Sequence, residues 1–308
     1  MLRRFFIALS ESRLLRSFAE RSSAGRRLSH RFVAGTKADD VLRVAGEVNQ
    51  AGLSVSIDHL GENVTDRSQA RASAGVYSRL LDEIASRQLR ANISLKLTHM
   101  GLDIDPDVAF ELVAGLVSKA AGMQPRNFVR VDMEGSAYTE RTLDFVRHLH
   151  AMSAGNGCVG AVIQAYMRRA EADIEKLLPE GVRIRLCKGA YREPPEIAFQ
   201  RKSEVDANYF RLMKILLKSG IYHGIATHDA KIIRATQAFA AQENIPRSAF
   251  EFQMLYGIRR DLQQKLARDG WGMRVYIPFG TEWYPYLMRR LAERPANALF
   301  LVKNLLHG

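Results

Sequence analysis

Eight short apolar segments, each followed by a longer amphipathic stretch, run through the chain from about residue 50 onward. The short segments have the length and the β-branched content of buried strands, and the longer stretches repeat their apolar residues at helical spacing. Asp105-Pro106 is a typical helix start, and Gly122, Gly220 and Gly270 follow expected helix ends. This alternation predicts a single parallel (β/α)8 barrel of the TIM type.

The expected strands cover residues 53–57, 93–97, 128–132, 159–164, 182–187, 224–227, 250–254 and 274–277. Helices are expected between them, among others at 107–121, 139–152, 169–178, 203–218, 232–243 and 262–268. A doubly wound sheet is the alternative fold, but no Gly-rich fingerprint follows any of the expected strands. The 308 residues, 47% of them hydrophobic, suffice for one large core.

Cysteine content and apolar runs exclude several classes of protein. The only two cysteines, Cys158 and Cys187, belong to no CxxC motif, so a disulfide framework or a structural zinc site is not expected, and no metal is predicted. No secretory signal or membrane span is recognisable. We therefore expect a cytoplasmic protein, or one of the mitochondrial matrix if the source is eukaryotic.

The N-terminal segment is strongly basic. Residues 1–35 contain eight arginines and two acids, which is half of the net charge of +12 of the whole chain. Phe and Leu residues lie between these arginines at roughly helical spacing. Such a helical arm, placed at residues 1–45 before a barrel at 46–308, can lie on an anionic membrane surface. It can equally pack on the barrel or resemble a transit peptide, and no motif for nucleic-acid binding accompanies its charge.

Polar side chains interrupt the expected strands at equivalent points. Seven of them fall at or just beyond the second half of a strand: Lys96, Asp132, Gln164, Arg185, Lys188, His228 and Gln253. The carboxyl ends of the strands in a TIM barrel form one face, and this face holds the active site. The pattern therefore predicts a catalytic site at the mouth of the barrel.

The last expected helix has an unusual face. Tyr286, Arg289, Arg290 and Glu293 follow one another at helical spacing, where an apolar stripe is more common, while Leu287 and its apolar neighbours occupy the adjoining faces. Two adjacent arginines offer forked donors for a carboxylate, and Glu293 can hold either guanidinium. The helix is expected to lie over the barrel mouth with this polar face toward a bound anionic group. A solvent-exposed ion-pair face is the alternative.

These residues give the chain its resemblance to the proline dehydrogenases. The Tyr-x-x-Arg-Arg-x-x-Glu helix is the substrate-binding signature of that family, and further similar segments precede it in the same order. They are Ser94-Leu95-Lys96-Leu97, Val131-Asp132-Met133-Glu134, Val162-Ile163-Gln164-Ala165-Tyr166, Arg183-Ile184-Arg185-Leu186-Cys187-Lys188-Gly189-Ala190-Tyr191, Ala226-Thr227-His228-Asp229, Glu251-Phe252-Gln253-Met254-Leu255-Tyr256-Gly257 and Val275-Tyr276-Ile277-Pro278-Phe279-Gly280.

The resemblance implies an FAD-dependent oxidation of L-proline to 1-pyrroline-5-carboxylate, with a membrane quinone as electron acceptor. It implies catalytic roles for Arg185, beside the flavin N5, and for Lys96 and Asp132. The implied substrate contacts are Lys96, Asp132, Ala190, Leu255, Tyr276, Tyr286, Arg289, Arg290 and Glu293. The implied cofactor contacts are Gln164, Arg185, Lys188, Gly189, Thr227, His228, Gln253 and Arg290.

The chemistry of proline suits these residue types. Its carboxylate needs fixed cations, its ring needs a close-fitting apolar slot, and a cation beside the flavin stabilises the reduced form. Asp132 is expected to order Lys96 and nearby water, or to accept a proton. Two other functions remain open from the residues alone: a Schiff-base lyase or aldolase using Lys96 or Lys188, and a basic membrane-associated binding protein.

Overall fold

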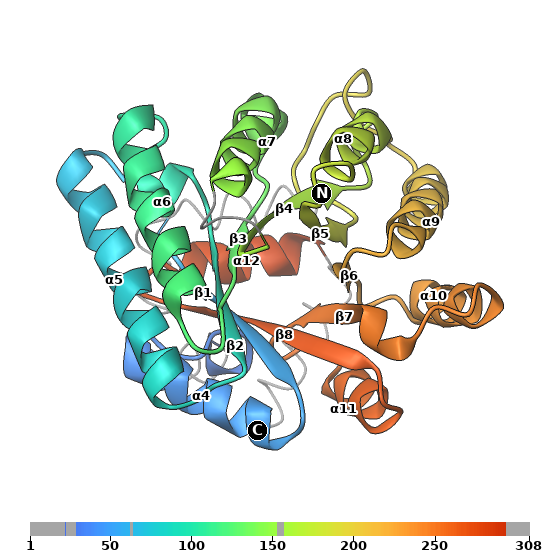
Figure 1. Cartoon of the computed structure of the whole chain (residues 1–308), viewed down its shortest axis with the longest axis horizontal. Helices are drawn as coiled ribbons and strands as arrows, with labels where there is room; N and C mark the ends of the chain where they lie inside the picture. Colours follow the sequence, from blue (N-terminus) through green and yellow to red (C-terminus); the bar gives the residue numbers. More distant parts are fainter. Residues whose placement is uncertain (1–21, 23–28, 62–63, 153–156, 294–308) are drawn as a thin grey trace.

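The structure is a computed structural model that describes residues 22, 29–61, 64–152 and 157–293, the last five of these by their backbone alone. Eight parallel strands close into a barrel in sequence order, each paired with the next and β8 paired with β1 (Figure 1). The strands are β1 (Ser54–His59), β2 (Ala91–Leu95), β3 (Val129–Val131), β4 (Val159–Gln164), β5 (Arg183–Cys187), β6 (His223–Ala226), β7 (Phe250–Leu255) and β8 (Gly272–Phe279). The predicted (β/α)8 barrel is confirmed.

Helices surround the barrel, as Figure 1 shows; most of them connect consecutive strands, one precedes β1 and one follows β8. They are α4 (Ala38–Gln50), α5 (Arg67–Ser86), α6 (Pro106–Gly122), α7 (Ser136–Ala151), α8 (Ala170–Leu177), α9 (Lys202–Lys218), α10 (Ala230–Gln242), α11 (Arg260–Arg268) and α12 (Trp283–Glu293), with short 3-10 turns η1 (Thr98–Met100) and η2 (Arg247–Ala249). Asp105 caps α6 by accepting hydrogen bonds from two backbone N–H groups, as the Asp-Pro start predicts.

Alternation within the strands separates apolar from polar side chains. Ile93 and Leu95 of β2 are fully buried in the main core, which lies between the strands and the surrounding helices. Asn92 and Ser94 alternate with them, and successive side chains of a strand point to opposite faces. The barrel interior is therefore lined with polar groups, whereas most barrels fill it with branched apolar residues.

Strand ends differ from the expected ones where backbone bonding continues past the apolar run. β1 extends to His59 because its last residues pair with Pro278 and Phe279 of β8. Pro278 lacks an N–H, and its carbonyl accepts a hydrogen bond from Ala34 N at 2.9 Å. This extension brings Asp58, which the expected strand 53–57 left out, into the barrel.

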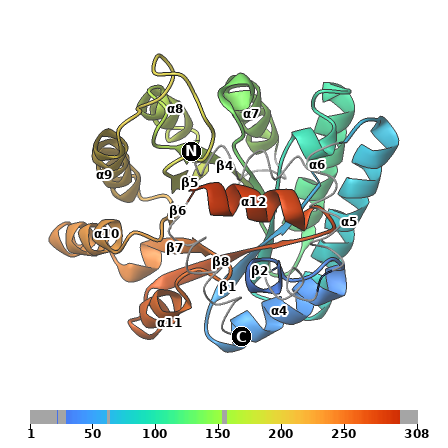
Figure 2. The ribbon, with the colours of Figure 1, turned by 180° about the vertical axis from the view of Figure 1, so that it is seen from behind.

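The last helix crosses the end of the barrel at which the strands finish (Figure 2). It is anchored by a second apolar cluster, in which Trp283, Leu287 and Met288 pack with Val33 and Leu60. The predicted position of the helix over the mouth is confirmed. Most of the basic arm lies outside the described residues. Of the helices that the structure describes, none combines the length and apolar character that crossing a membrane requires.

Candidate active site

Arg185 lies at the centre of the polar barrel interior and is 6% exposed. Its Nη1 donates to Asp132 Oδ1 at 2.6 Å and to Ser94 Oγ at 3.2 Å. Its Nη2 donates to Ser56 Oγ at 3.2 Å, and its Nε donates to Gln253 Oε1 at 2.5 Å. Four other strands or strand ends thus fix one guanidinium. A cation held in this way needs no reorganisation when negative charge develops beside it.

Asp132 follows β3 and receives hydrogen bonds on both carboxylate oxygens. Ser94 Oγ and Arg185 donate to Oδ1 at 2.8 and 2.6 Å, and Tyr276 OH donates to Oδ2 at 2.7 Å. The Tyr276 ring lies under the Arg185 guanidinium, 5.2 Å from its central carbon. We call Arg185, Asp132, Tyr276, Ser56, Ser94 and Gln253 the mouth cluster.

Burial raises the pKa of Tyr276 well above its usual value, and the charge of Asp132 adds to that effect. The phenol therefore keeps its proton and acts as a hydrogen-bond donor. Gly224 of β6 leaves room for this arrangement, because a Cβ at that position would collide with the side-chain amide of Gln253.

Lys96 follows β2 and forms an ion pair with Asp58 Oδ2 of β1 at 3.3 Å. Asp58 is 1% exposed, and its other oxygen accepts a hydrogen bond from Tyr77 OH at 3.4 Å. Asp132, on the other side of β2, is hydrogen-bonded by Ser94, Arg185 and Tyr276, so its ordering of Lys96 stays a prediction.

Three expected cofactor residues come together where β4 and β5 end. Gln164 Nε2 donates to the carbonyl of Glu134 at 2.9 Å, and Gln164 Oε1 accepts from Ala190 N at 3.4 Å. Gly189 has a φ of 111°, and a Cβ there would collide with the Tyr166 ring. Only glycine fits this backbone. Lys188, directly before it, pairs with Asp206 and Asp229 at 2.5 and 3.1 Å.

The remaining expected residues lie at the ends of β6 and β7. His228 Nε2 accepts a hydrogen bond from Leu255 N at 3.0 Å, which leaves the ring proton on Nδ1 in the neutral form. Thr227 N donates to the carbonyl of Gln253 at 3.0 Å, and Thr227 Oγ1 accepts from Asp229 N at 3.1 Å. The ends of β4 to β7 thus present amide, imidazole and ammonium groups at the same end of the barrel.

On α12, Tyr286 is 7% exposed and packs in the apolar cluster with Trp283 and Leu60. The side chains of Arg289, Arg290 and Glu293 lie outside the described part of the structure, although their backbone continues the helix. The structure therefore places the expected site residues of the barrel in the second halves of the strands or just beyond them.

Sequence reasoning missed several members of the mouth. Asp58 was overlooked because its strand was ended two residues early, at residue 57 instead of His59, and Ser56 and Ser94 because a lone serine carries little signal. A period-two reading of each strand would have found all three, since they alternate with fully buried Val55, Ile57, Ile93 and Leu95. No group of His, Cys, Asp or Glu suited to a metal ion is found among the described side chains.

The sequence pattern of the family described as Proline dehydrogenase matches residues 41–303. The chain belongs to the proline dehydrogenase family. It is 41% identical to proline dehydrogenase 1 of Bacillus subtilis, with 99% of each chain covered, and 36% identical to the proline dehydrogenase of Deinococcus radiodurans, with 91% of each covered.

A proline utilization A (PutA) structure from Bdellovibrio bacteriovorus, inactivated by N-propargylglycine, has the same fold. It superposes with a TM-score of 0.81 at 26% identity and covers 87% of this chain. This chain spans about a third of that longer protein, 33% of its length. The family match covers all eight strands and the last helix, so the mouth cluster lies within the shared region.

Proposed function

We propose that the protein oxidises L-proline to 1-pyrroline-5-carboxylate, the first step of proline catabolism to glutamate, and passes the electrons to a quinone. Membership of the family supports the substrate, and the fixed Arg185–Asp132–Tyr276 arrangement at the barrel mouth is the observation that carries the chemistry. FAD, when bound, supplies the N5 acceptor for the hydride that leaves proline C5.

The donor set of the mouth fits such a cofactor. The Gln164 amide, the His228 imidazole, the Lys188 ammonium and the bare backbone of Gly189 line the ends of four neighbouring strands. Amide and cationic donors suit the heteroatoms of a flavin ring and its phosphates, and glycine permits close approach of backbone to a ligand. Arg185 would lie beside N5, with Thr227 and Gln253 next to it.

The substrate carboxylate requires cations at the mouth. Lys96 is 14% exposed and is held by Asp58, so it is ordered before substrate arrives. Arg289 and Arg290 lie on the helix that crosses the mouth and are proposed to grip the same carboxylate, with Glu293 orienting them. Ala190, Leu255 and the rings of Tyr276 and Tyr286 are proposed to enclose the proline ring.

Hydride can leave C5 only after the ring nitrogen has released one proton, and its lone pair then forms the C5=N double bond. A wall of cations favours the neutral amine over the ammonium form. Asp132 is already engaged by three donors, which supports a role in holding Arg185 and Tyr276 rather than as the base. The proton is proposed to leave to solvent.

A Schiff-base mechanism requires a neutral lysine as nucleophile. Lys96 and Lys188 both lie against carboxylates, which stabilise the charged ammonium. The reading of the protein as a lyase or aldolase therefore has no support from the contacts of these lysines.

The decisive experiment follows the flavin band of the purified protein. We expect a yellow protein whose absorbance near the flavin maximum is bleached by L-proline under anaerobic conditions and restored by a soluble quinone. D-proline serves as the matched control. A protein that stays colourless after supplementation with FAD, or a flavin that L-proline does not bleach, would refute the proposal.

The paired arginines can be tested separately. Arg289→Met or Arg290→Met is expected to raise the KM for proline at least tenfold while FAD remains bound, since each removes a charged hydrogen-bond partner of the carboxylate. Arg234→Met, which removes an exposed arginine of α10, is the control. If a variant keeps the affinity of the wild type for proline, the arginine that it replaces does not bind the substrate.

The basic arm is proposed to bring the enzyme to the membrane that holds its quinone. Deletion of residues 1–35 should weaken binding to anionic liposomes and activity with membrane quinone more than activity with a soluble dye. Equal losses in all three assays would instead assign the arm a role in packing alone.

A further inference from the structure

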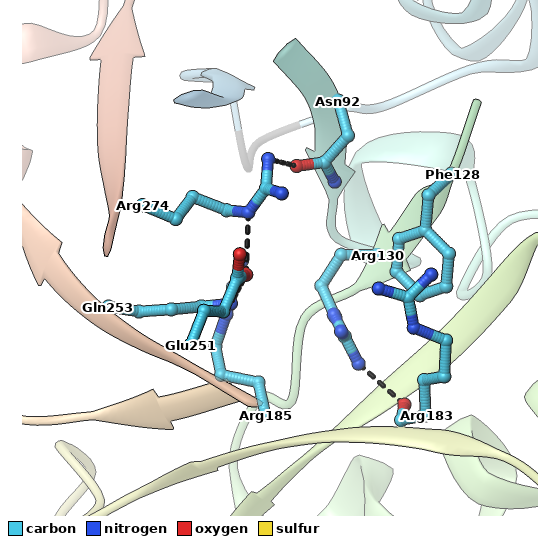
Figure 3. Close-up of a pocket in the computed structure, with 8 residues that line it drawn as sticks. All are labelled: Asn92, Phe128, Arg130, Arg183, Arg185, Glu251, Gln253 and Arg274. Atoms are coloured by element: carbon cyan, nitrogen blue, oxygen red, sulfur yellow. Dashed lines mark hydrogen bonds and ion pairs between the residues drawn. The ribbon is translucent and has the colours of Figure 1, made fainter. Parts of the chain in front are cut away.

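A second charged cluster lies at the opposite end of the barrel interior, toward the N-terminal ends of the strands. We call Asn92, Phe128, Arg130, Arg183, Glu251 and Arg274 the base cluster. Figure 3 shows these side chains around a small cavity, which Arg185 and Gln253 complete. The cavity measures about 20 Å³. A cavity of about 10–15 Å³ already accommodates one water molecule, so there is room for one small species.

Glycine makes the position of Arg130 possible. Arg130 comes from β3 and extends beneath β4, where a Cβ at Gly160 would collide with its Nη1 and with the carbonyl of Arg183. Its Nη1 donates to the carbonyls of Ala161 and Arg183 at 2.8 and 2.6 Å. The guanidinium is thus built into the floor of the barrel at a place that only glycine leaves open.

The base cluster contains three guanidinium groups and one carboxylate. Glu251 accepts from Arg274 Nε at 2.6 Å, from Gln253 Nε2 at 2.6 Å and from Tyr222 OH at 3.0 Å. Both of its oxygens are therefore engaged. Arg130 and Arg183 form no ion pair with any carboxylate in the described part of the chain. Each lies instead over the Phe128 ring, at 4.6 and 4.4 Å.

Arg130 carries an unsatisfied donor in this position. The residue is 4% exposed, and its Nε has no hydrogen-bond partner in the structure. Burial lowers its pKa well below the usual value, and the neighbouring charges of Arg185 and Arg183 lower it further. A buried cation without a counter-charge is costly, so a native protein retains one where a ligand or a partner compensates it.

We propose that the cavity of the base cluster binds one monatomic anion of the halide class, with chloride as its cellular ligand. The unpaired cations and the free Nε–H of Arg130 provide the attraction. The size of the cavity favours a monatomic anion over phosphate and carboxylates, because a chloride ion is closer in size to a water molecule. The anion enters from the base of the barrel, where the half-buried Arg183 and Arg274 reach the surface. The cavity lies beneath the mouth cluster and shares Arg185 and Gln253 with it.

Thermal unfolding of the flavin-loaded protein tests the proposal in solution. At constant ionic strength, replacement of gluconate by chloride or bromide should raise the unfolding midpoint along a saturating curve, by about 2 °C or more at saturation. Arg130→Met should abolish this increase, and the surface variant Arg234→Met should retain it. Equal midpoints in chloride and gluconate at every concentration would overturn the proposal.

A second variant covers the case in which Arg130→Met does not fold. Arg183→Gln removes a half-buried cation from the base cluster. The halide concentration that gives half of the maximal stabilisation should rise at least tenfold. Crystals grown in sodium bromide provide direct localisation, with an anomalous peak expected between Arg130 and Arg274. Water alone at that position overturns the proposal. A bromide peak without any saturable change in stability means an adventitious ion only, and it overturns the proposal equally.

Discussion

The two ends of the barrel interior are both buried and both charged, but their charges are balanced differently. In the mouth cluster, Arg185 has Asp132 as its counter-ion, and Lys96 nearby has Asp58. In the base cluster, Arg274 alone has a carboxylate, Glu251, while Arg130 and Arg183 rely on carbonyl oxygens and an aromatic ring. Paired charges hold the mouth cluster in one fixed arrangement, whereas the unpaired cations of the base cluster are the ground for the anion site proposed there.

One side chain connects the two clusters. Gln253 accepts from Arg185 through Oε1 and donates to Glu251 through Nε2, at 2.5 and 2.6 Å. Both bonds are short, so the amide orientation is set by its two neighbours. The comparison predicts that substitutions in the mouth affect turnover and stability together, while substitutions in the base affect stability and anion binding.

Arg185→Met should have the largest effect. It leaves Asp132 buried without its cation, which costs about 3–5 kcal/mol of stability. It also removes the proposed stabilisation of the reduced flavin, so we expect kcat with proline to fall by about 10²–10³. The rate of flavin reduction by proline, followed by stopped flow, measures the effect on catalysis. Circular dichroism first establishes that the variant is folded.

The double variant Arg185→Met/Asp132→Asn is the control for that experiment. It removes both charges of the pair and should recover part of the stability without recovering turnover. A single variant that keeps turnover within tenfold of the wild type contradicts the catalytic role of Arg185.

Glu251→Gln should produce the next largest effect, at the base. It removes the one carboxylate of that cluster and leaves Arg274 unpaired, for a loss of about 3–5 kcal/mol in chemical unfolding. Burial alone raises the pKa of Glu251, but the charge and hydrogen bonds of Arg274 outweigh it and the net pKa is lowered. The stabilising effect of the carboxylate is therefore present above pH 4.5 and is lost as the pH falls further.

Two results would weigh against this account of the base cluster. One is a difference in unfolding free energy between Glu251→Gln and wild type that does not become smaller below pH 4.5. The other is a smaller stabilisation by chloride in the variant than in the wild type, because removal of the carboxylate makes the cavity more positive.

The fold was predictable because the repeat of strand and helix is local in the sequence. Apolar runs identify the strands, and their number and spacing fix the barrel. The ends of β1 and β8 were not predictable in the same way, because they depend on pairing with each other and with the chain near Ala34. Such contacts join residues more than 200 positions apart.

The mouth was predictable and the base was not, although both are polar. Lys96 and Asp132 stand out because they follow an apolar run. Arg130 and Arg183, nearer the starts of their strands, read as ordinary polar residues at a solvated end. Their direction into the barrel depends on the register between neighbouring strands, such as Arg130 opposite Gly160. A single strand does not specify it.

The pH dependence of the unfolding free energy tests buried histidines, and its expected effects are smaller than those of the substitutions above. Burial is the main cause that lowers the pKa of His59 to about 4, of His99 to about 3 and of His223 to about 3, and cations near His99 and His223 contribute. These rings are neutral in the folded state and take up protons on unfolding at a pH below about 6.5. Each therefore reduces stability by up to about 1.4 kcal/mol per pH unit as the pH falls from 6.5 toward its folded pKa.

His223→Asn isolates the contribution of His223 to the pH dependence of stability. Its side-chain oxygen can still accept from Ile184 N, as His223 Nδ1 does at 2.9 Å, but it does not titrate. Unfolding by urea at intervals between pH 7 and pH 5 should show a shallower pH dependence in the variant. The same slope in both proteins would mean that His223 is not buried in its neutral form.

Two tyrosines provide the finest test of the comparison, because each donates to the carboxylate of its own cluster. Tyr276 OH donates to Asp132 at 2.7 Å, and Tyr222 OH donates to Glu251 at 3.0 Å. Burial raises the pKa of both phenols, so both remain donors at neutral pH. Tyr276→Phe and Tyr222→Phe should each cost about 1.5 kcal/mol, the loss of one hydrogen bond to a charged group.

Their effects on proline oxidation should differ. Only Tyr276→Phe should lower kcat/KM for proline, since its hydroxyl orients Asp132 and its ring lies under Arg185. Tyr222→Phe should leave proline kinetics unchanged and reduce only the unfolding free energy. If both variants lose proline turnover to the same extent, the bonds through Gln253 couple the two clusters, and the base cannot be treated as independent of the reaction at the mouth.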